Sequence, residues 1–423
     1  MFCVPLRCLL DCRFAKTMNK PFLVRLLFVA FLAFALFRAA EAQSTPADDC
    51  NARSRDAIAH VSLPGHPFGS AVTKDGCWIF VSLVGDRQRS NGVAMLRRSG
   101  GKVKLEKVFT LEARPTELVL TRDSKLLIIA ALSDVIFLDV EKMLAKNGDP
   151  VLGAIHQGDS AGSIQVNVTS DDKFLFVSEE RAQSITVIDL KKAVAEKFGS
   201  SSIIGRIHTG LAPIALVFSP DEKLLYTTSE VGPQKESWPV DCNPENPARS
   251  GGPPNPEGLV EVVDVERAKT QPDKSVIAVV PAKCSPVRMA MSPRGDYVYV
   301  TARNSNAMLV FDTSKLAHNS KDALVAEVPV GSAPVPIAVV DSGKRILVGN
   351  SNRFAGKTDN QDVLVIDATK VSSGKAAIVG KIPAGGFPRE FSASPDGQTL
   401  FLSNFGTDTL EIIDVARLPG KSD

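Results

Sequence analysis

The sequence predicts an all-β protein, a seven-bladed β-propeller of four-stranded blades in which an N-terminal strand closes the last blade. Three observations support this prediction: a motif that recurs seven times, short apolar runs separated by turn residues, and a last copy that lacks its fourth strand. The copies begin at Pro67, Pro115, Ser163, Pro213, Pro286, Pro334 and Pro388. The steps between them are 48, 48, 50, 73, 48 and 54 residues, close to the length of a propeller blade.

Each copy contains apolar runs of four to seven residues that are rich in Val, Ile, Leu and Phe. Such runs between turn residues are typical of short strands. In the fourth copy the predicted strands a, b, c and d cover residues 214–219, 223–228, 259–264 and 275–280. Tight turns such as Ser394-Pro395-Asp396-Gly397 join strands a and b, and their Pro and Gly favour a hairpin and not a phosphate-binding loop.

The two ends of the repeat region predict how the ring closes. The last copy contains strands a, b and c within residues 391–414 and no fourth strand after them. Residues 57–63 precede Pro67 in the way that a strand d precedes the later copies. We predict that residues 57–63 form strand d of blade seven, because a closed ring leaves no unpaired strand edge.

Several b strands, each followed by a strand that ends in Asp, resemble the YVTN-type β-propeller repeat. They are Phe176-Val177-Ser178, Tyr299-Val300-Thr301-Ala302 and Phe401-Leu402-Ser403-Asn404. The resemblance covers residues 57–415 and implies the seven-bladed fold. It also implies three functional classes: secreted or surface-layer-type binding proteins, lactonase-like enzymes, and the larger subunits of periplasmic dehydrogenases.

The region before the repeats has the order of a secretory signal. Lys20 and Arg25 precede a 12-residue apolar run at 26–37, and Ala40-Glu41-Ala42 follows it as a cleavage site. We predict a signal peptide over residues 1–42, with Met18 as an alternative start, and an extension over 43–56. The propeller then covers 57–415, with an insertion over 230–258 in blade four, and a tail covers 416–423. A membrane anchor is the alternative, but the apolar run is short for a span of about 20 residues.

Charge and compartment limit the partners that we expect. The chain has a formal net charge of +2, and residues 1–42 carry a net +4, so the remaining chain carries −2. Without a basic excess, the counterion release that drives nucleic-acid binding is missing. We therefore expect a periplasmic or extracellular protein without a membrane span after signal cleavage. Its expected partner is a small polar ligand or an extracytoplasmic protein, and not a nucleic acid.

Four cysteines remain after the predicted cleavage, and they allow three pairings. In an antiparallel blade, the d-to-a and b-to-c loops lie on one face, which we call the top, and the other loops lie on the bottom. Cys242 and Cys284 fall in top loops of adjacent blades, whereas Cys50 and Cys77 fall near the bottom of blades seven and one. We predict the disulfides Cys242–Cys284 and Cys50–Cys77. A metal site is the alternative, but the chain lacks the CxxC or HxxxH spacing of such sites.

The 73-residue step marks one large insertion, which begins after Ser229 and is rich in Pro and Gly. We expect it to contain no regular strand. Loops of this length are functional or disordered in most compact domains. Trp238 and the predicted tether at Cys242 favour an ordered cover over the top face, and a tolerated surface insertion is the alternative.

Candidate site residues gather where the a strands begin, at the mouth of the central channel. Two positions after the start of each copy the chain has Gly69, Glu117, Gln165, Ala215, Arg288, Pro336 and Glu390. Arg389 lies one position after the last start. Glu117, Arg288 and Glu390 could bind a polar ligand or act as acid and base. Mutual ion pairing that holds the mouth together is the alternative.

Other polar residues lie in the predicted top b-to-c regions and could enlarge the same site. They are Glu179, Glu180, Arg181, Arg303, Asn350, Asn352, Arg353 and Asn404. His66, at the top of blade one, is the histidine that we retain as a candidate. His156 and His208 occupy the same repeat position, which indicates duplication and not a site.

These observations favour a non-catalytic binding scaffold that holds a small polar ligand or a protein on its top face. One alternative is a lactonase-like hydrolase that draws its base from Glu117, Glu390 or His66, and a divalent metal is expected only in that case. Another is the non-catalytic propeller subunit of a periplasmic dehydrogenase. We predict no cofactor and assign no catalytic residue. The chain lacks Cys-x-x-Cys-His, the attachment motif of covalent c-type haem.

Overall fold

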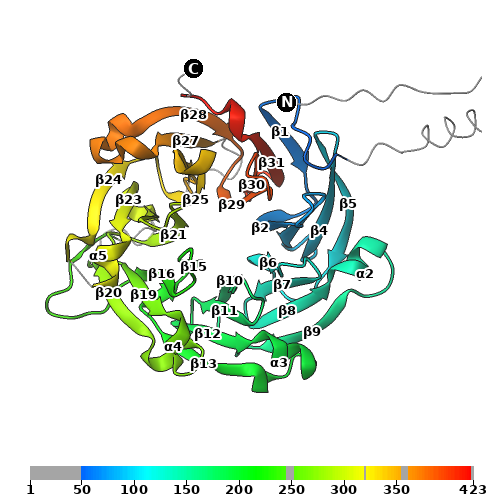
Figure 1. The fold of residues 1–423 in the computed structure, drawn as a ribbon, viewed down its shortest axis with the longest axis horizontal. Helices are drawn as coiled ribbons and strands as arrows, with labels where there is room; N and C mark the ends of the chain where they lie inside the picture. The colour runs from blue at the N-terminus through cyan, green and yellow to red at the C-terminus, as the bar shows by residue number, and fades with distance from the viewer. Residues whose placement is uncertain (1–48, 244–251, 319–320, 354–360, 421–423) are drawn as a thin grey trace, which may run out of the picture. The chain divides into compact units, whose positions relative to one another are not determined.

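Seven antiparallel sheets lie in a ring within the unit that runs from Cys50 to Asp423 (Figure 1). The structure is a computed structural model that describes residues 49–243, 252–318, 321–353 and 361–420. The predicted signal peptide over residues 1–42 lies outside the described residues, as does the end of the predicted tail. The ring confirms the prediction of a seven-bladed β-propeller.

The strands of blades one to four follow one another along the chain. Blade one has β2 (His66–Val72), β3 (Trp78–Val84), β4 (Gly92–Ser99) and β5 (Lys102–Thr110). Blade two has β6 (Leu118–Leu120), β7 (Leu126–Ala131), β8 (Asp134–Asp139) and β9 (Val151–His156). Blade three has β10 (Ser163–Val168), β11 (Phe174–Glu179), β12 (Ser184–Asp189) and β13 (Ile203–His208). In blade four strand a is divided into β14 (Leu211–Pro213) and β15 (Val217–Phe218). The other strands of this blade are β16 (Leu224–Val231), β19 (Leu259–Asp264) and β20 (Val276–Pro281).

The last blade takes its fourth strand from the N-terminal side. Blade five has β21 (Pro286–Met291), β22 (Tyr297–Ala302), β23 (Ala307–Asp312) and β24 (Leu324–Pro329). Blade six has β25 (Pro334–Val340), β26 (Arg345–Asn350), β27 (Gln361–Asp367) and β28 (Ile378–Ala384). Blade seven has β29 (Pro388–Ala393), β30 (Thr399–Asn404), β31 (Thr409–Asp414) and β1 (Ile58–Ser62). β1 pairs antiparallel with β31, with His60 opposite Glu411, so the predicted closing strand is confirmed.

The Asp that ends most c strands begins a short helix on the bottom side of the blade. These helices are α2 (Val140–Ala145), α3 (Leu190–Ala195), α4 (Val265–Ala268), α5 (Thr313–Ala317), η7 (Ala368–Ala377) and η8 (Val415–Arg417). The Asp189 carboxylate accepts a hydrogen bond from the Lys192 amide, the usual N-cap arrangement. Single 3₁₀ turns are η1 (Ser200–Ser202), η3 (Pro272–Lys274), η4 (Arg303–Ser305), η5 (Lys321–Ala323) and η6 (Asp341–Gly343). The sequence pattern did not predict these helices, because the α-helices among them have only four to six residues, too few to show a helical period.

The a-to-b turns link neighbouring blades at the bottom of the ring. Asp172 has a left-handed backbone, with φ of 55°, and its carboxylate accepts hydrogen bonds from the Arg122 amide of the preceding blade at 2.9 and 3.0 Å. Glu222 accepts from the Ser170 amide in the same way, at 2.8 and 3.0 Å. In blade five this turn position is Gly295 (φ 79°), where a side chain would collide with Pro220 of blade four. The turns therefore bind one blade to the next.

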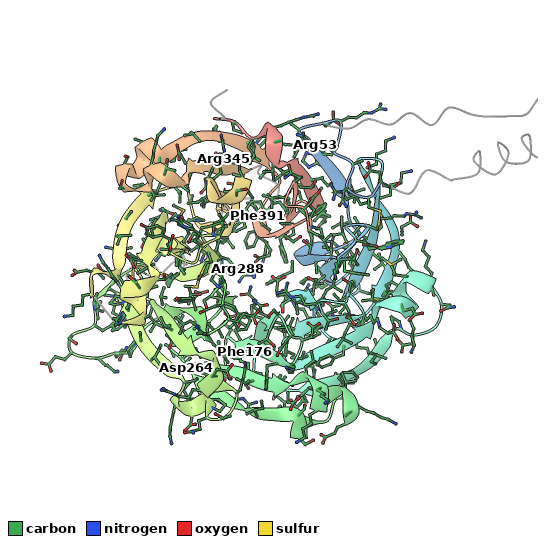
Figure 2. The ribbon with its side chains drawn as sticks, viewed as in Figure 1. Arg53, Phe176, Asp264, Arg288, Arg345 and Phe391 are labelled. Atoms are coloured by element: carbon green, nitrogen blue, oxygen red, sulfur yellow. A yellow bond between two sulfur atoms is a disulfide. The ribbon has the colours of Figure 1, made fainter. Side chains whose placement is uncertain are left out.

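The hydrophobic core lies between adjacent blades. Phe176 of β11, for example, is fully buried against Leu216, Leu225 and Val263 of blade four (Figure 2). Equivalent clusters join the other neighbouring blades. Burial between blades stabilises the ring only when every blade is in place, because each sheet covers its neighbour.

Both predicted disulfides are present. Cys50 is bonded to Cys77 and Cys242 to Cys284, with Cα–Cα distances of 4.7 and 5.4 Å. The predicted assignment of these loops to the two faces is therefore confirmed. Among the described residues, each helix is too short or too polar to cross a bilayer.

The insertion in blade four contains a small hairpin, which corrects the expectation that it has no regular strand. β17 (Val240–Cys242) pairs with β18 (Asn255–Pro256), and the Trp238 indole donates a hydrogen bond to the Glu257 carbonyl at 2.8 Å. Pro and Gly break long strands but allow a pairing of two or three residues at the base of a loop.

Candidate functional site

A cavity of about 150 Å³ lies at the top mouth of the channel. Its walls come from the starts of a strands and from the top loops of blades three to seven. The lining residues are Ile164, Glu180, Ile214, Glu230, Val287, Arg288, Arg303, Val335, Arg353, Phe387 and Arg389. Figure 2 shows Arg288 near the centre of the ring and Asp264, the N-cap of α4, at its periphery. A cavity of this volume accommodates a molecule of about the size of benzene.

Two ion pairs lie in or next to this cavity. Arg288 of β21 donates from Nε to the Glu390 carboxylate of β29, across the channel from blade five to blade seven. Both side chains are shielded from water, with exposed fractions of 4% and 13%. Arg303 donates to Glu230 at 2.7 Å. A shielded, hydrogen-bonded pair of this kind avoids the large free-energy penalty of an unpaired buried charge.

Arg389 is stabilised in another way. Its guanidinium carbon lies 3.9 Å from the centre of the Phe68 ring and 5.5 and 5.8 Å from those of Phe387 and Phe405. Its buried Nε has no hydrogen-bond partner among the described residues. Burial, reinforced by the positive charge of Arg288, lowers the pKa of Arg389 to about 9. The guanidinium is therefore still cationic at neutral pH, with a donor that a ligand could use.

Glu117 lies in the same charged region but makes no ion pair among the described residues. Its carboxyl packs against Gly69, where any side chain would collide with it, and its Oε1 accepts one hydrogen bond from the Leu118 amide at 3.3 Å. Burial and the negative charge of Glu390 raise the pKa of Glu117 to about 8. Glu117 is therefore mainly protonated at neutral pH.

Gln165 extends the same ring of side chains on β10. Its Oε1 is buried without a hydrogen-bond partner among the described residues, like Oε2 of Glu117. Such atoms are uncommon in folded proteins, and a ligand or ordered water is one way to satisfy them.

His66 and Asn404, also candidates from the sequence, do not line the cavity. His66 of blade one contacts Asp408 of blade seven, whereas Asn404 lies at the end of β30 within blade seven. His66 Nδ1 is 2.6 Å from an Asp408 carboxylate oxygen, and Arg89 donates to its Nε2 at 2.9 Å. Because Nε2 accepts, the proton of the neutral ring lies on Nδ1. Asn404 is buried and donates to Glu411 at 3.1 Å. These contacts give His66 a structural role between blades one and seven, and give Asn404 a structural role within blade seven.

The sequence did not lead us to expect the apolar walls of the cavity, although the repeat contains their signal. Ile164, Ile214, Val287 and Val335 all occupy the position one residue after the start of a copy. Of the residues at that position, the sequence indicated only Arg389, its charged member, as a candidate. Of the top b-to-c residues named from the sequence, Glu180, Arg303 and Arg353 do line the cavity.

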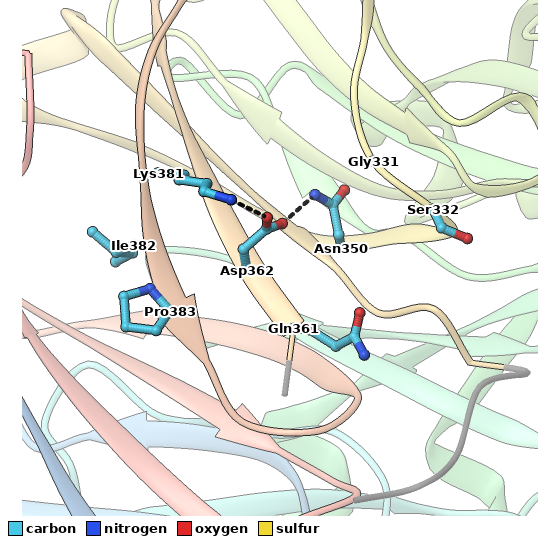
Figure 3. A pocket seen from close by; sticks show the side chains of 8 residues that line it. All are labelled: Gly331, Ser332, Asn350, Gln361, Asp362, Lys381, Ile382 and Pro383. Carbon is cyan, nitrogen blue, oxygen red and sulfur yellow. Dashed lines mark hydrogen bonds and ion pairs between the residues drawn. The ribbon is translucent and has the colours of Figure 1, made fainter. Parts of the chain in front are cut away.

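A second cavity, of about 540 Å³, lies on the top of blade six (Figure 3). Its polar groups largely satisfy one another: Asn350 donates to the Asp362 carboxylate at 2.6 Å, and Lys381 Nζ lies 3.7 Å from that carboxylate. One of its lining residues, Gln361, directly follows residues 354–360 in the sequence, and those residues are outside the described part of the chain. We therefore assign it no role.

One group of potential metal ligands is found among the described residues: Asp241, Cys242 and Cys284. The two sulfur atoms are bonded to each other. They are therefore not available as thiolate ligands, which are the form in which cysteine binds metals.

No protein-family model matches the chain, and no curated protein matches it. Among solved structures, a chain of Kuenenia stuttgartiensis hydrazine synthase is similar over 88% of this chain and 99% of its own, with 16% identity and a TM-score of 0.60. A chain from a crystal structure of the mitotic checkpoint complex is similar over 88% and 97%, with 14% identity and a TM-score of 0.60. At this level of identity the similarity shows a shared fold, the β-propeller.

Proposed function

We propose that the protein is an extracytoplasmic, non-catalytic binding scaffold that holds a small polar ligand in the cavity at the top mouth of its channel. The observation that carries the proposal is the convergence of four arginines, from blades five, six and seven, on one small cavity. Ligand sites in proteins commonly combine apolar walls with a few converging polar groups. The buried Nε of Arg389 supplies a donor without a partner among the described residues.

Two features support the extracytoplasmic location. The two disulfides suggest an oxidising compartment, in which such bonds form and persist. The sequence of residues 1–42 has the order of a secretory signal. Membership of the YVTN-type propeller repeat family, proposed from the strand motifs, agrees with both.

The groups near the cavity fit binding better than catalysis. A general base must be unprotonated at the working pH, whereas the raised pKa of Glu117 leaves that carboxyl mainly protonated at pH 7. Glu390 is held by Arg288, and the ring of His66 is held by Asp408 and Arg89.

Calorimetric titration of the purified protein with small anions, cations and neutral polar compounds tests the proposal. We expect binding of an anion, weakened at least tenfold in Arg288→Ala and Arg389→Ala. The matched control is Arg294→Ala, since Arg294 lies in the bottom turn of blade five and its side chain is 86% exposed. Equal binding by all variants, or no binding of any compound, would contradict the proposal.

A second assay distinguishes the scaffold from its alternatives. Turnover of a lactone panel, with and without divalent metal, that disappears in Glu117→Gln or Glu390→Gln would establish a lactonase-like enzyme instead. Constant co-purification with a cofactor-carrying chain would favour a subunit of a periplasmic dehydrogenase. We expect neither result.

A further inference from the structure

The cavity at the channel mouth has two chemically different sides. One side is apolar and consists of Ile164, Ile214, Val287, Val335 and Phe387. The four aliphatic members are at most 7% exposed and pack in two of the small clusters that line the channel. A ligand that leaves these side chains in contact with water gains no free energy from them, whereas an apolar group placed against them does.

The other side is charged: it carries the four arginines Arg288, Arg303, Arg353 and Arg389 together with Glu180 and Glu230. The positive charges of these arginines are unequally neutralised. Arg288 is paired with Glu390, and Arg303 with Glu230. Arg389 packs against three aromatic rings and forms no ion pair among the described residues. Burial is the main cause of the lowered pKa of Arg389, and the neighbouring arginines Arg288, Arg353 and Arg303 lower it further. A ligand with one negative charge would relieve the mutual repulsion of these cations.

The size of the cavity limits the rest of the ligand. About 150 Å³ accommodates one benzene-sized group. A second negative charge on the ligand would have to lie against the apolar side, where an unpaired charge is strongly disfavoured. Inorganic phosphate would satisfy the arginines but would leave the apolar side without a partner.

We infer that the cavity binds a small organic monocarboxylate with a compact apolar body, such as a branched aliphatic or an aromatic acid. The carboxylate accepts hydrogen bonds from the Arg389 guanidinium, and the body lies against Val287 and its apolar neighbours. This inference rests on the proposed function, because it names the class of ligand for the same cavity.

Four probe compounds test the inference by calorimetry on the intact protein: benzoate, acetate, benzamide and inorganic phosphate. Benzoate keeps both the charge and the apolar body, acetate lacks the body, benzamide lacks the charge, and phosphate tests anion binding alone. We expect benzoate to bind at least tenfold more tightly than each of the others. Isobutyrate serves as the branched aliphatic counterpart of benzoate.

Two variants assign the sides of the cavity separately. Arg389→Gln is expected to reduce the preference for benzoate over benzamide towards one. Val287→Thr, which changes a methyl group into a hydroxyl at nearly constant volume, is expected to reduce the preference for benzoate over acetate and to leave phosphate binding unchanged. Arg294→Ala is the surface control, and circular dichroism checks the fold of each variant. If Arg389→Gln does not fold, the comparison of the four probe compounds on the wild-type protein and the Val287→Thr variant still test the inference.

The possible failures are distinguishable. Phosphate binding as tight as benzoate binding, or equal affinity for acetate and benzoate, would overturn the inference and leave the proposed function in place. Binding of a neutral polar ligand without binding of benzoate would likewise overturn the inference and leave the proposed function in place. If no compound binds, both the inference and the proposed function fail.

Discussion

Three buried ionisable side chains at the channel show three different ways in which a folded protein accommodates such groups. Arg288 is paired with Glu390, Arg389 is packed against aromatic rings, and Glu117 keeps its proton. The ion pair and the protonated carboxyl each avoid an unpaired ion in a region of low dielectric, whereas the aromatic rings stabilise the Arg389 cation through their faces. These side chains respond differently to a change in pH, and the differences lead to predictions for single residues.

The affinity for an anionic ligand is expected to fall as pH rises from 7 to 8.5. Over this range Glu117, with a pKa of about 8, loses its proton and adds a negative charge beside Glu390, Arg288 and Arg389. Glu117→Gln removes this titration, so its benzoate affinity should change less over the same range. Calorimetry at several pH values measures the effect.

Glu261 is expected to make the folded state less stable as pH rises. It is buried on β19, where the Gly210 amide and the Ser229 hydroxyl donate to its carboxyl at 3.2 and 3.0 Å. Burial raises its pKa from 4.5 to about 7. Below pH 4.5 the Glu261 carboxyl is protonated in both the folded and the unfolded protein, so its burial costs no stability there. Between pH 4.5 and 7 the unfolded state ionises first, so stability falls by up to about 3 kcal/mol and then stays level.

Glu261→Gln, which keeps an acceptor oxygen without the charge, should therefore raise the melting temperature more at pH 8 than at pH 5. Thermal denaturation at both pH values measures this difference. Glu266→Gln is the control, since Glu266 is 77% exposed on the neighbouring helix α4. The same gain at both pH values would show that Glu261 is not the titrating group.

At the scale of secondary structure, closure of the ring depends on one short strand. β1 makes five residue pairs with β31, and Ala59 and Val61 pack against a cluster that includes Leu410 and Ile412. The Cys50–Cys77 disulfide and a 2.8 Å ion pair between Arg53 and Asp414 hold the segment before β1. The strand and its attachments thus form one closing device.

Removal of the residues up to Leu63, combined with Cys77→Ser, should lower the melting temperature and cause aggregation. The reason is that β31 would expose an unpaired edge, which seeks other strands. The matched control is the longer chain with Cys50→Ser and Cys77→Ser, which loses the disulfide and keeps β1. Thermal denaturation and light scattering compare the two. A truncated protein that stays monomeric and melts with the control would show that β1 is dispensable.

At the scale of the whole molecule, the two disulfides join parts of the ring that are distant along the chain, with sequence separations of 27 and 42 residues. A disulfide that closes a loop of this length reduces the conformational entropy of the unfolded chain. This destabilises the unfolded state and so stabilises the fold by about 3–4 kcal/mol per bond. Reduction of the protein should therefore lower its melting temperature clearly. Cys242→Ser with Cys284→Ser should lower the free energy of unfolding by a similar amount.

Peptide mapping without reductant gives the connectivity directly. It should recover Cys242 linked to Cys284 and Cys50 linked to Cys77. A dominant pair across the two faces, such as Cys77 with Cys242, would contradict the arrangement of the top and bottom loops.

Much of this molecule could be predicted from the sequence because the information is local and repeated. The phase of the repeat places Glu117, Arg288 and Glu390 at the channel, and the alternation of antiparallel strands assigns each cysteine to a face. The short helices after the c strands could not be predicted in this way, because an Asp at a strand end is also compatible with an ordinary turn. The hairpin of β17 and β18 involves too few residues to leave a pattern.

The sequence by itself determined the number of blades, the closing strand, the disulfide partners and the charged residues Glu117, Arg288 and Glu390 at the channel, because each depends on periodicity along the chain. Only the tertiary structure decided which of those residues meet. The contact between Arg288 and Glu390 spans two blades, and the packing of Arg389 on Phe68 joins strands at opposite ends of the chain. The channel cavity and the contacts that hold His66 exist only after the ring has closed, since they depend on distances across it that no local pattern encodes.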